Sequence, residues 1–306
     1  MKILRGLGFV SAWALLIGTT AFAQVEGVFI GKSESNVQTD ATTVIVNPTP
    51  PSAFYGGAYG FTVSVEGTGL SAPIVTLPGN ATIPTADATS HNSGELGFNP
   101  QDNEWAYGSP NFNNWGAQSA AEIDTLFGTG TYTVTVPVYG AVDLALNTSL
   151  ADIATIISSA PLFTLSGGTW SNGTYYVDPS QSVTITTNTF AEYGDNAAGH
   201  IDFSVQTNGG PQLYQGEYFS TDNPTDDFIT YTIDPGTLIS GQTYTVYAAF
   251  ASILELDNAI ADALSASFLE RSTAFILQAV PEPSTYAALT GLAVLAVVVW
   301  RKRRFV

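Results

Sequence analysis

The chain has 306 residues, no cysteine, and 8 Lys and Arg against 26 Asp and Glu, which gives a formal net charge of −18 at pH 7. The lack of cysteine excludes disulfides, thiolate catalysis and cysteine-ligated metals. Between Gln24 and Ala279 only two basic residues, Lys32 and Arg271, stand against 25 acidic ones, a formal charge of −23. Such an acidic surface repels nucleic acid and anionic lipid, so neither is expected as a partner.

The first 23 residues have the form of a secretory signal peptide. Lys2 and Arg5 precede an apolar run, and Ala21-Phe22-Ala23 places the small residues Ala21 and Ala23 where a signal peptidase cleaves. The segment predicts export by the Sec machinery and cleavage after Ala23.

Residues 24–51 are expected to form a short N-terminal piece. It has a strand at Val44–Val46 and a stiff, polyproline-like connector at Pro48–Pro51. Beyond the connector the chain is rich in Thr, Val, Tyr, Phe, Gly and Asn, a composition typical of β structure. Period-2 alternation predicts half-buried antiparallel strands at Phe61–Val65, Tyr132–Val136, Val183–Thr186, Ile201–Val205 and Tyr244–Tyr247.

Two stretches interrupt the β pattern. Asp143–Ile157 and Leu254–Leu269 are richer in Ala and Leu, with apolar residues near helical spacing, and predict two short helices. Their alignment suggests an internal repeat with offsets of 110 to 112 residues, in which Tyr132 corresponds to Tyr244. Chance similarity among Thr/Val strands is the alternative.

The expected fold is therefore mainly β: an exported antiparallel β-sandwich of two Ig-like or related repeats with short helices, at residues 52–166 and 167–279. About 100 residues suit one sandwich, and the tyrosine hydroxyl of each repeat can bond back across a corner at the entry of its strand. A single larger sandwich or jelly roll is the competing architecture.

Catalytic residues are hard to select. His200 and Asp202 with one of many serines would make a triad, but no Gly-x-Ser-x-Gly motif supports it. Paired carboxylates for glycoside hydrolysis cannot be selected among so many acids. The chain is therefore not expected to be an enzyme, and no cofactor is expected.

Calcium is the one metal for which the chain has candidate ligands. Asp222, Asp226 and Asp227 lie in a short loop of oxygen-bearing side chains, the ligands that hard cations prefer. The loop lacks EF-hand spacing, and Asp in turns has a purely conformational use, so these residues are weak candidates.

An aromatic loop supplies a candidate glycan platform. Trp105, Tyr107 and Trp115 lie among Asn and Gly, and flat aromatic rings beside amide donors suit the stacking of sugar rings. In the alternative interpretation, Trp105 and Trp115 close the ends of the sandwich core.

The last 27 residues have three parts. Pro281-Glu282-Pro283-Ser284 is followed by the uncharged stretch Thr285–Trp300 and then by the basic stub Arg301, Lys302, Arg303 and Arg304. As a helix, the uncharged stretch would be about 24 Å long, against a hydrocarbon core of about 30 Å. It predicts one short C-terminal transmembrane helix whose basic end stays in the cytoplasm.

This order of parts resembles the PEP-CTERM sorting signal, also known as the ice-binding protein C-terminal motif, of Gram-negative envelope proteins. The resemblance covers residues 280–306 only. It implies an exosortase-type membrane protease as partner, and removal of the tail from an inner-membrane intermediate. The protein would then reach the cell surface, the outer envelope or the extracellular space, often together with exopolysaccharide. A plain one-helix anchor without processing is the alternative.

The expected function is that of a structural or adhesive protein of the envelope or exopolysaccharide matrix. A carbohydrate-binding module acting on exopolysaccharide is the first alternative, and a polysaccharide hydrolase is the second.

Overall fold

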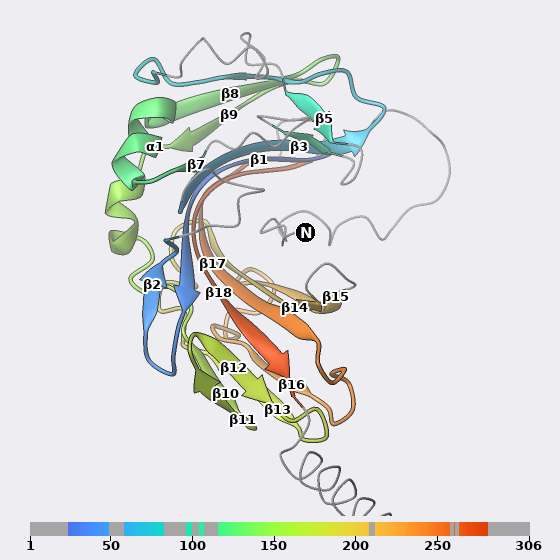
Figure 1. Cartoon of the computed structure of the whole chain (residues 1–306). Helices are drawn as coiled ribbons and strands as arrows, with labels where there is room; N and C mark the ends of the chain where they lie inside the picture. Colours follow the sequence, from blue (N-terminus) through green and yellow to red (C-terminus); the bar gives the residue numbers. More distant parts are fainter. Residues whose placement is uncertain are drawn as a thin grey trace, which may run out of the picture.

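The computed structural model describes residues 24–48, 58–82, 96–99, 104–106, 116–207, 212–257, 260 and 263–280. Its main element is a strongly curved sheet of twelve strands (Figure 1). The path through this sheet runs β15 (Gln212–Phe219), β14 (Ala198–Thr207), β17 (Thr243–Asp257), β18 (Leu264–Ala279), β1 (Gln24–Gln38), β3 (Tyr59–Thr68), β6 (Glu104–Ala106) and β5 (Gly97–Asn99). Short strands pair beside this path: β2 (Val44–Val46) with β1, β7 (Gly116–Ala117) with β3, β12 (Thr174–Val177) with β18, and β11 (Gly168–Ser171) with β12.

Two three-stranded sheets pack on the outer side of the curve (Figure 1). One contains β4 (Ile74–Thr76), β8 (Gly130–Val136) and β9 (Gly140–Leu146), and the other β10 (Phe163–Ser166), β13 (Val183–Thr187) and β16 (Thr230–Ile233). The helix α1 (Ala120–Phe127) and the 3-10 helix η2 (Leu150–Thr155) lie beside the first small sheet. Mainly β structure is thus confirmed.

Each small sheet encloses a separate hydrophobic core against the large one. The first core contains Val28, Val63 and Leu144, and the second contains Phe203, Phe250 and Phe275. These side chains alternate with others on the opposite, concave face, because successive residues of a strand point to opposite sides. Strand β18 contributes to both cores, through Leu269 to the first and Phe275 to the second.

Several sequence predictions need correction. The helix expected at Leu254–Leu269 is wrong, because β17 extends to Asp257 and β18 starts at Leu264. Both strands are covered on two faces, so their long apolar runs lose the alternation that identifies a strand. The helix expected at Asp143–Ile157 is too long, since Asp143–Leu146 ends β9 and the helical part is η2 alone.

The sheet is also mixed rather than wholly antiparallel. Strand β18 runs parallel to both β1 and β12, and the other pairings are antiparallel. The second copy of the predicted repeat therefore lacks the helix expected at Leu254–Leu269. The two tyrosines are not equivalent either, because Tyr132 lies in β8 of a small sheet and Tyr244 in β17 of the large one. The boundary between residues 166 and 167 stays a prediction.

The two tyrosines nevertheless make the predicted bonds across a corner. The Tyr132 hydroxyl donates to the carbonyl of Phe127, five residues upstream, at 2.8 Å. The Tyr244 hydroxyl accepts from the amide of Ile239, also five residues upstream, at 2.7 Å. The two tyrosines therefore make similar hydrogen bonds near the start of their strands, although the strands belong to different sheets.

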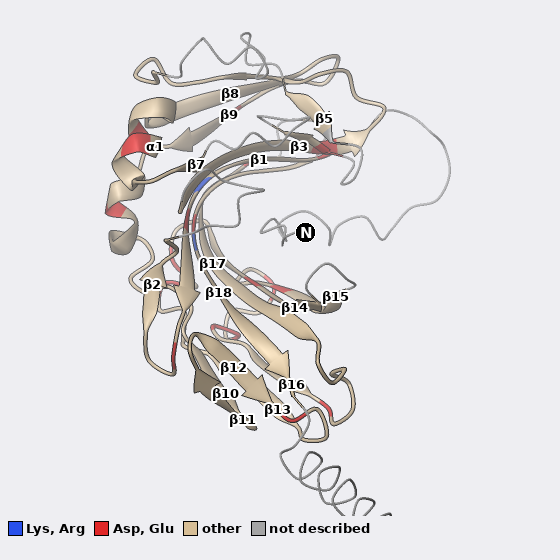
Figure 2. Cartoon of the chain, in the orientation of Figure 1, with Lys and Arg blue, Asp and Glu red and all other residues tan. Residues whose placement is uncertain are grey.

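Both basic residues of the described chain lie on the long central strands (Figure 2). Lys32 Nζ is 2.7 Å from Asp124 Oδ1, and Arg271 Nη2 is 2.7 Å from Glu34 Oε1. Because both charges are neutralised close to the core, the surface of the described residues is left acidic or neutral.

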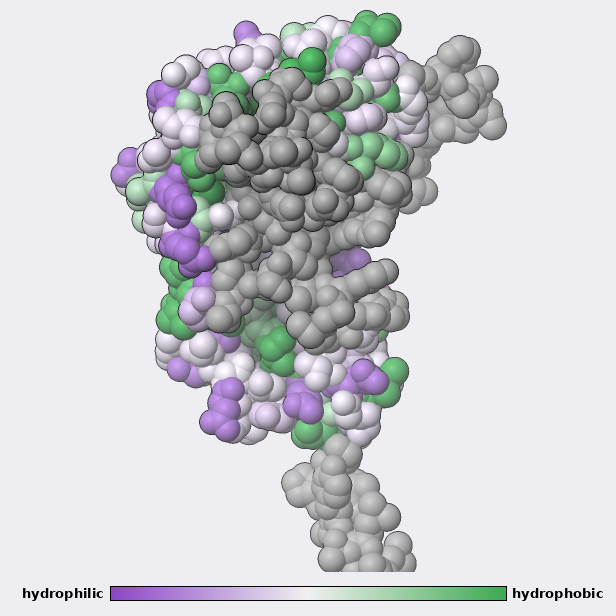
Figure 3. All heavy atoms as spheres, turned by 45° about the horizontal axis from the view of Figure 1, so that its top comes forward, coloured by the Kyte–Doolittle hydropathy of each residue, from purple (hydrophilic) through white to green (hydrophobic). Residues whose placement is uncertain are grey.

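Exposed apolar side chains occur on this surface, among them Val138, Ile239 and Phe228. In Figure 3 hydrophobic and hydrophilic residues are interspersed over the described part of the face in view. Scattered apolar residues of this kind are normal for a folded surface.

Strand β1 changes character along its length. Its outer-face residues Val28 and Ile30 belong to the first core, but the next four residues on that face are polar and buried. We call these four residues, Lys32, Glu34, Asn36 and Gln38, the polar seam. They lie where the first core ends and the second begins.

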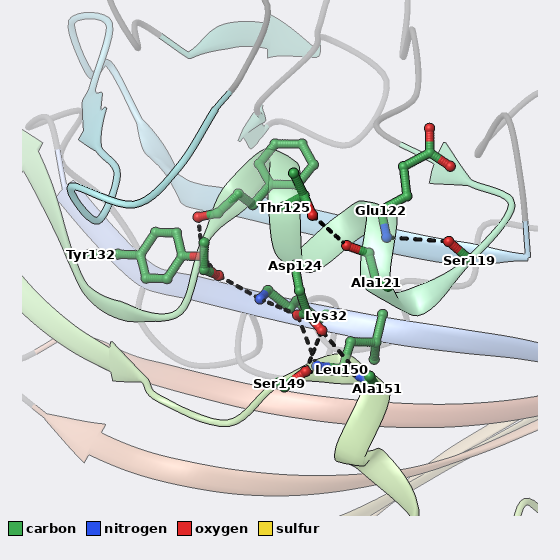
Figure 4. Close-up of polar contacts among 12 residues, drawn as sticks. Lys32, Ser119, Ala121, Glu122, Asp124, Thr125, Tyr132, Ser149, Leu150 and Ala151 are labelled. Carbon is green, nitrogen blue, oxygen red and sulfur yellow. Dashed lines mark hydrogen bonds and ion pairs between the residues drawn. The ribbon is translucent and has the colours of Figure 1, made fainter.

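The upper end of the seam is closed by Asp124 of α1 (Figure 4). Besides Lys32, this carboxylate accepts hydrogen bonds from the Ser149 hydroxyl and from the amides of Leu150, at 2.8 Å, and Ala151, at 3.1 Å. Burial opposes its ionisation, but these donors outweigh that effect and lower the pKa of Asp124. The carboxylate therefore joins β1, α1 and the start of η2.

The lower seam joins β1 to its neighbours through side chains. Asn36 donates to the carbonyl of Ser272, at 3.0 Å. The side-chain nitrogen of Gln38 donates to the backbone carbonyl of Phe163 at 2.8 Å, and the side-chain oxygen of Gln38 accepts from the backbone amide of Phe163 at 2.7 Å. The side chain thus makes the two hydrogen bonds that a neighbouring strand would make. Gln38 thereby attaches β10 of the second small sheet to β1.

We predict that Asp124→Ala destabilises the exported chain by about 3–5 kcal/mol, because it leaves the Lys32 ammonium buried without a counter-charge. Lys32→Met should cost less, about 1–3 kcal/mol, since Asp124 keeps its other donors. Urea unfolding measures both, with exposed Asp234→Ala as a control expected within about 0.5 kcal/mol. Equal losses for Asp124→Ala and Asp234→Ala would contradict the role of the ion pair.

Candidate functional site

The concave face of the large sheet gathers carboxyl groups from strands that are distant in the sequence. Residues directly opposite each other in neighbouring strands point to the same face. Asp202 of β14 is opposite Glu217 of β15. Two residues away on the same face of β14, His200 is opposite Ala251 of β17, and Ala251 is in turn opposite Glu270 of β18. These residues alternate with the core residues Ile201 and Phe203 and so point away from the second core.

Asp202, Glu217 and Glu270 form the lower acidic group. Their pKa values are raised to about 7, about 8 and about 7, and burial is the largest cause for each. The next cause for Glu217 is the Asp202 carboxyl across the strand pair, while Glu270 accepts a hydrogen bond from the Tyr247 hydroxyl at 3.0 Å, which opposes its shift. At neutral pH the lower group is therefore only partly ionised.

His200 lies beside this group. Its Nε2 is 4.0 Å from Glu217 Oε2, within reach of an ion pair. Burial, however, lowers the pKa of His200 to about 3, so the imidazole is neutral and does not neutralise the carboxylate. The ring lies against Phe219, with centroids 4.3 Å apart.

Glu66 and Glu104 form the upper acidic group. They are opposite each other in β3 and β6, and both are buried. The pKa of Glu66 is raised to about 9 by burial first, and then by the carboxylates of Glu104, Glu26 and Glu217. Glu217 of β15, a strand far from β3 in the strand order, contributes least to this shift.

Between the two groups the concave face is apolar and closely packed. Phe29 and Phe268 are buried there with Ala251 and Ala266. A Cβ at Gly31 would lie 2.2 Å from the Phe268 ring, so only glycine leaves room for this ring. The face therefore consists of a phenylalanine floor with carboxyl groups at both ends.

Of the predicted glycan platform, Trp105 alone lies within the described residues. It packs on the border of the first core, and its ring centroid is 5.2 Å from that of Phe98. This position agrees with the core-closing interpretation of Trp105. Tyr107 and Trp115 lie outside the described residues, so the platform stays a prediction.

The calcium candidates Asp222, Asp226 and Asp227 lie in the loop between β15 and β16. Among the residues that the structure describes, no group of three or more acidic or histidine side chains is arranged to hold a metal ion. Backbone turns account for part of this loop, in which the amide of Asp222 bonds to the carbonyl of Phe219 and that of Asp226 to the carbonyl of Asn223.

The sorting residues also lie outside the described part. They are the predicted cleavage pair Ala21 and Ala23, the motif Pro281, Glu282, Pro283 and Ser284, the stretch Thr285–Trp300 that was predicted to be a helix, and the stub Arg301, Lys302, Arg303 and Arg304. Within the described ranges, no helix has both the length and the apolar character needed to cross a membrane.

Comparison with protein families gives one match. Residues 279–304 match the model of the PEP-CTERM protein-sorting motif. A search of curated proteins finds no match to this chain. The resemblance of the tail is thus confirmed for the tail alone, and it identifies an exported protein that an exosortase sorts at the membrane toward the cell surface.

The match begins at the end of the last described strand. Ala279 is the last residue of β18, and its amide bonds to the carbonyl of Gln242. The next residue, Val280, donates to the carbonyl of Val177 at 2.8 Å. The sorting motif therefore follows the sheet without a linker.

Sequence reasoning noted His200 and Asp202 but missed Glu66, Glu217 and Glu270. Their alternation with apolar residues was visible, yet it did not tell which strands are neighbours. Without the register, these acids could not be separated from the other acidic residues of the chain.

We predict that the folded body becomes less stable as the pH rises from about 6.5 to 9. Carboxyls whose folded pKa exceeds the unfolded value of about 4 hold protons that the unfolded chain has lost, and this stabilisation disappears as the pH passes through the folded pKa values. His200 acts in the opposite sense, but only below its unfolded pKa of about 6.5. Urea midpoints at pH 6.5 and 9 measure the change.

Asp202→Asn removes one of these titrating carboxyls and should reduce the loss of stability between the two pH values. Exposed Asp226→Asn, which makes the same change of charge, should leave it unaltered. A midpoint that is constant or rises over this range would show that the concave carboxyls are not held protonated.

Proposed function

We propose that this protein is a structural or adhesive component of the envelope or exopolysaccharide matrix, that it acts at the cell surface, and that it is not an enzyme. The observation that carries the proposal is the sorting motif that directly follows β18. Processing at such a motif leaves the body with almost no chain beyond its last strand. The body would therefore stay close to its point of attachment.

The surface of the body supports this role. Lys32 and Arg271 are neutralised internally, so the exported body presents only acidic and neutral groups. Such a surface keeps the protein soluble and repels nucleic acid and anionic lipid, while leaving neutral or cationic matrix components as partners.

Binding of carbohydrate is the second candidate function. It is favoured by the concave face, where carboxyl groups border a phenylalanine floor. Convergent polar groups around an apolar floor are typical of ligand sites. Hydrolysis of a bound polysaccharide, lost on changing Asp202 or Glu217, would instead favour the hydrolase alternative.

We predict that Glu282→Ala and Pro283→Ala leave export intact but retain an uncleaved, membrane-bound chain. Prolines fix φ and favour an extended backbone that a protease can bind, and Glu282 is the one charged side chain of the motif. Mass spectrometry of the exported protein measures the C-terminus, with Asp234→Ala as the control that should still be cleaved. A peptide containing Trp300 on most surface molecules of the unaltered protein would mean that the tail is a permanent anchor.

The surface role itself is tested by deleting the gene and returning either the full chain or residues 1–280. Loss of matrix cohesion that only the full chain restores would support the proposal, because only that chain has the sorting motif. Unchanged cohesion after deletion, or full rescue by the shortened chain released into the medium, would contradict it.

A further inference from the structure

The Lys32 ammonium group and the Asp124 carboxylate are in contact at the boundary of the first core (Figure 4). Lys32 is completely buried, and its Nζ is 2.7 Å from Asp124 Oδ1. The cost of taking two charges out of water can exceed the attraction between them. An amide between the same two side chains is uncharged and carries no such cost. The contact therefore holds two groups whose condensation would remove two buried charges.

The acceptors around Lys32 Nζ match the hydrogens of an amide better than those of an ammonium group, which has three N–H donors. Within the described residues, Nζ has two acceptors, Asp124 Oδ1 and the carbonyl oxygen of Gly128 at 2.6 Å. If Nζ is joined to Asp124, one N–H remains, and the Gly128 carbonyl accepts it. The amide therefore leaves no N–H of Nζ without a partner.

The other contacts of Asp124 place two donors on the oxygen that does not contact Lys32. This oxygen, Oδ2, accepts from the Ser149 hydroxyl and from the amide of Ala151 at 3.1 Å. Lys32 contacts Oδ1, which also accepts from the amide of Leu150 at 2.8 Å. Fixed donors on one oxygen are the arrangement that stabilises the oxyanion of a tetrahedral intermediate. The site thus has a nucleophile on one side of the carboxyl group and oxyanion donors on the other.

We propose that Lys32 and Asp124 condense to an intramolecular amide bond, an isopeptide, after the chain has folded. The ion pair is the state before this bond forms. The bond joins β1 to α1 across a sequence separation of 92 residues. In a chain without cysteine it acts as a disulfide would, because closing a long loop restricts the unfolded state. The inference does not depend on the proposed surface role.

The condensation releases one water molecule and changes no oxidation state. The Lys32 ammonium group first gives a proton to Asp124 Oδ1 along their hydrogen bond, and the amine nitrogen then attacks Cγ. The negative charge that develops on Oδ2 is stabilised by Ser149 and Ala151. A second proton passes from the nitrogen to Oδ1, the Cγ–Oδ1 bond breaks, and water leaves. The third proton stays on the amide nitrogen, which donates to Gly128.

The environment of the pair has opposing effects on the rate. Burial lowers the pKa of Lys32, although Asp124 acts against this shift, and so favours the amine that attacks. Burial also opposes ionisation of Asp124, but the donors around its carboxyl outweigh burial and lower its pKa. The reactive neutral pair is therefore a minor species, and the bond forms slowly in a fold that keeps the two groups in contact. The Asp124 side chain is 15% exposed, which gives the released water a route out.

Mass spectrometry of the denatured, exported protein tests the bond. We expect a mass lower than that of the processed sequence by one water molecule. Trypsin adds an independent readout, because it selects a positively charged side chain, and residues 24–279 contain only Lys32 and Arg271. The denatured protein should be cut after Arg271 and stay intact after Lys32. Digestion with a glutamate-specific protease should give one linked peptide that contains both Lys32 and Asp124.

Asp124→Ala and Lys32→Arg remove the bond in different ways. Lys32→Arg is the matched control, since it keeps the charge but replaces the amine by a guanidinium group that stays protonated. Both variants should have the full mass, and trypsin should cut Asp124→Ala after Lys32 and Lys32→Arg after the new arginine. Ser149→Ala removes a donor to Oδ2 and should leave a larger fraction without the bond at equal times after synthesis. The exposed Ser240→Ala should condense as the unaltered protein does.

An exported protein of full mass that trypsin cuts after Lys32 would overturn the inference and leave the surface role intact. This outcome is measured on the unaltered chain, so it does not require any variant to fold. Loss of water that persists in Asp124→Ala would also overturn the inference, because the condensation would then lie elsewhere. If Ser149→Ala condensed as fast as Ser240→Ala, the assignment of the Oδ2 donors would be wrong.

Discussion

The structure depends on the burial of four polar residues in one strand. After Ile30, the outer face of β1 continues with Lys32, Glu34, Asn36 and Gln38, where a single continuous core would require apolar side chains. Polar groups at such depth are tolerated only when they are hydrogen-bonded, and each of the four has a partner. The seam thus lets one sheet pass from one core to the next without an interruption of its strands, and it uses every basic residue of the described body to do so.

The same use of charge shapes the concave face. An ion pair in the seam neutralises one acid for each basic residue, and the described body has only Lys32 and Arg271 to offer. Any carboxyl on the other face must then be exposed, protonated or paired with something outside the chain. The carboxyls of Glu66, Asp202 and Glu217 are buried, and their raised pKa values favour the protonated form.

The sequence predicted those parts of the fold that local chemistry determines. The strands at Tyr132–Val136 and Ile201–Val205 show clean alternation because one face of each packs apolar side chains in a core and the other carries polar ones, and they were found. The end of β17 and the start of β18 were mistaken for a helix, because strands covered on both faces lose that signal. The concave site depends on the parallel pairing of β18 with β1 and on sheet curvature. Neither is encoded in a short stretch of residues, so the site could not be predicted.

Strand β18 connects the body to its sorting signal. It lies between β17 and β1, pairs with β12 near its end, and contributes to both cores, so its backbone is fixed through Ala279. The amide of Val280 is still bonded to Val177, whereas the prolines at 281 and 283 have no amide hydrogen with which to continue the ladder. The sorting motif thus begins directly after a backbone that three neighbouring strands hold in place, and folding of the body through Val280 limits how far toward the N-terminus a protease could bind the chain.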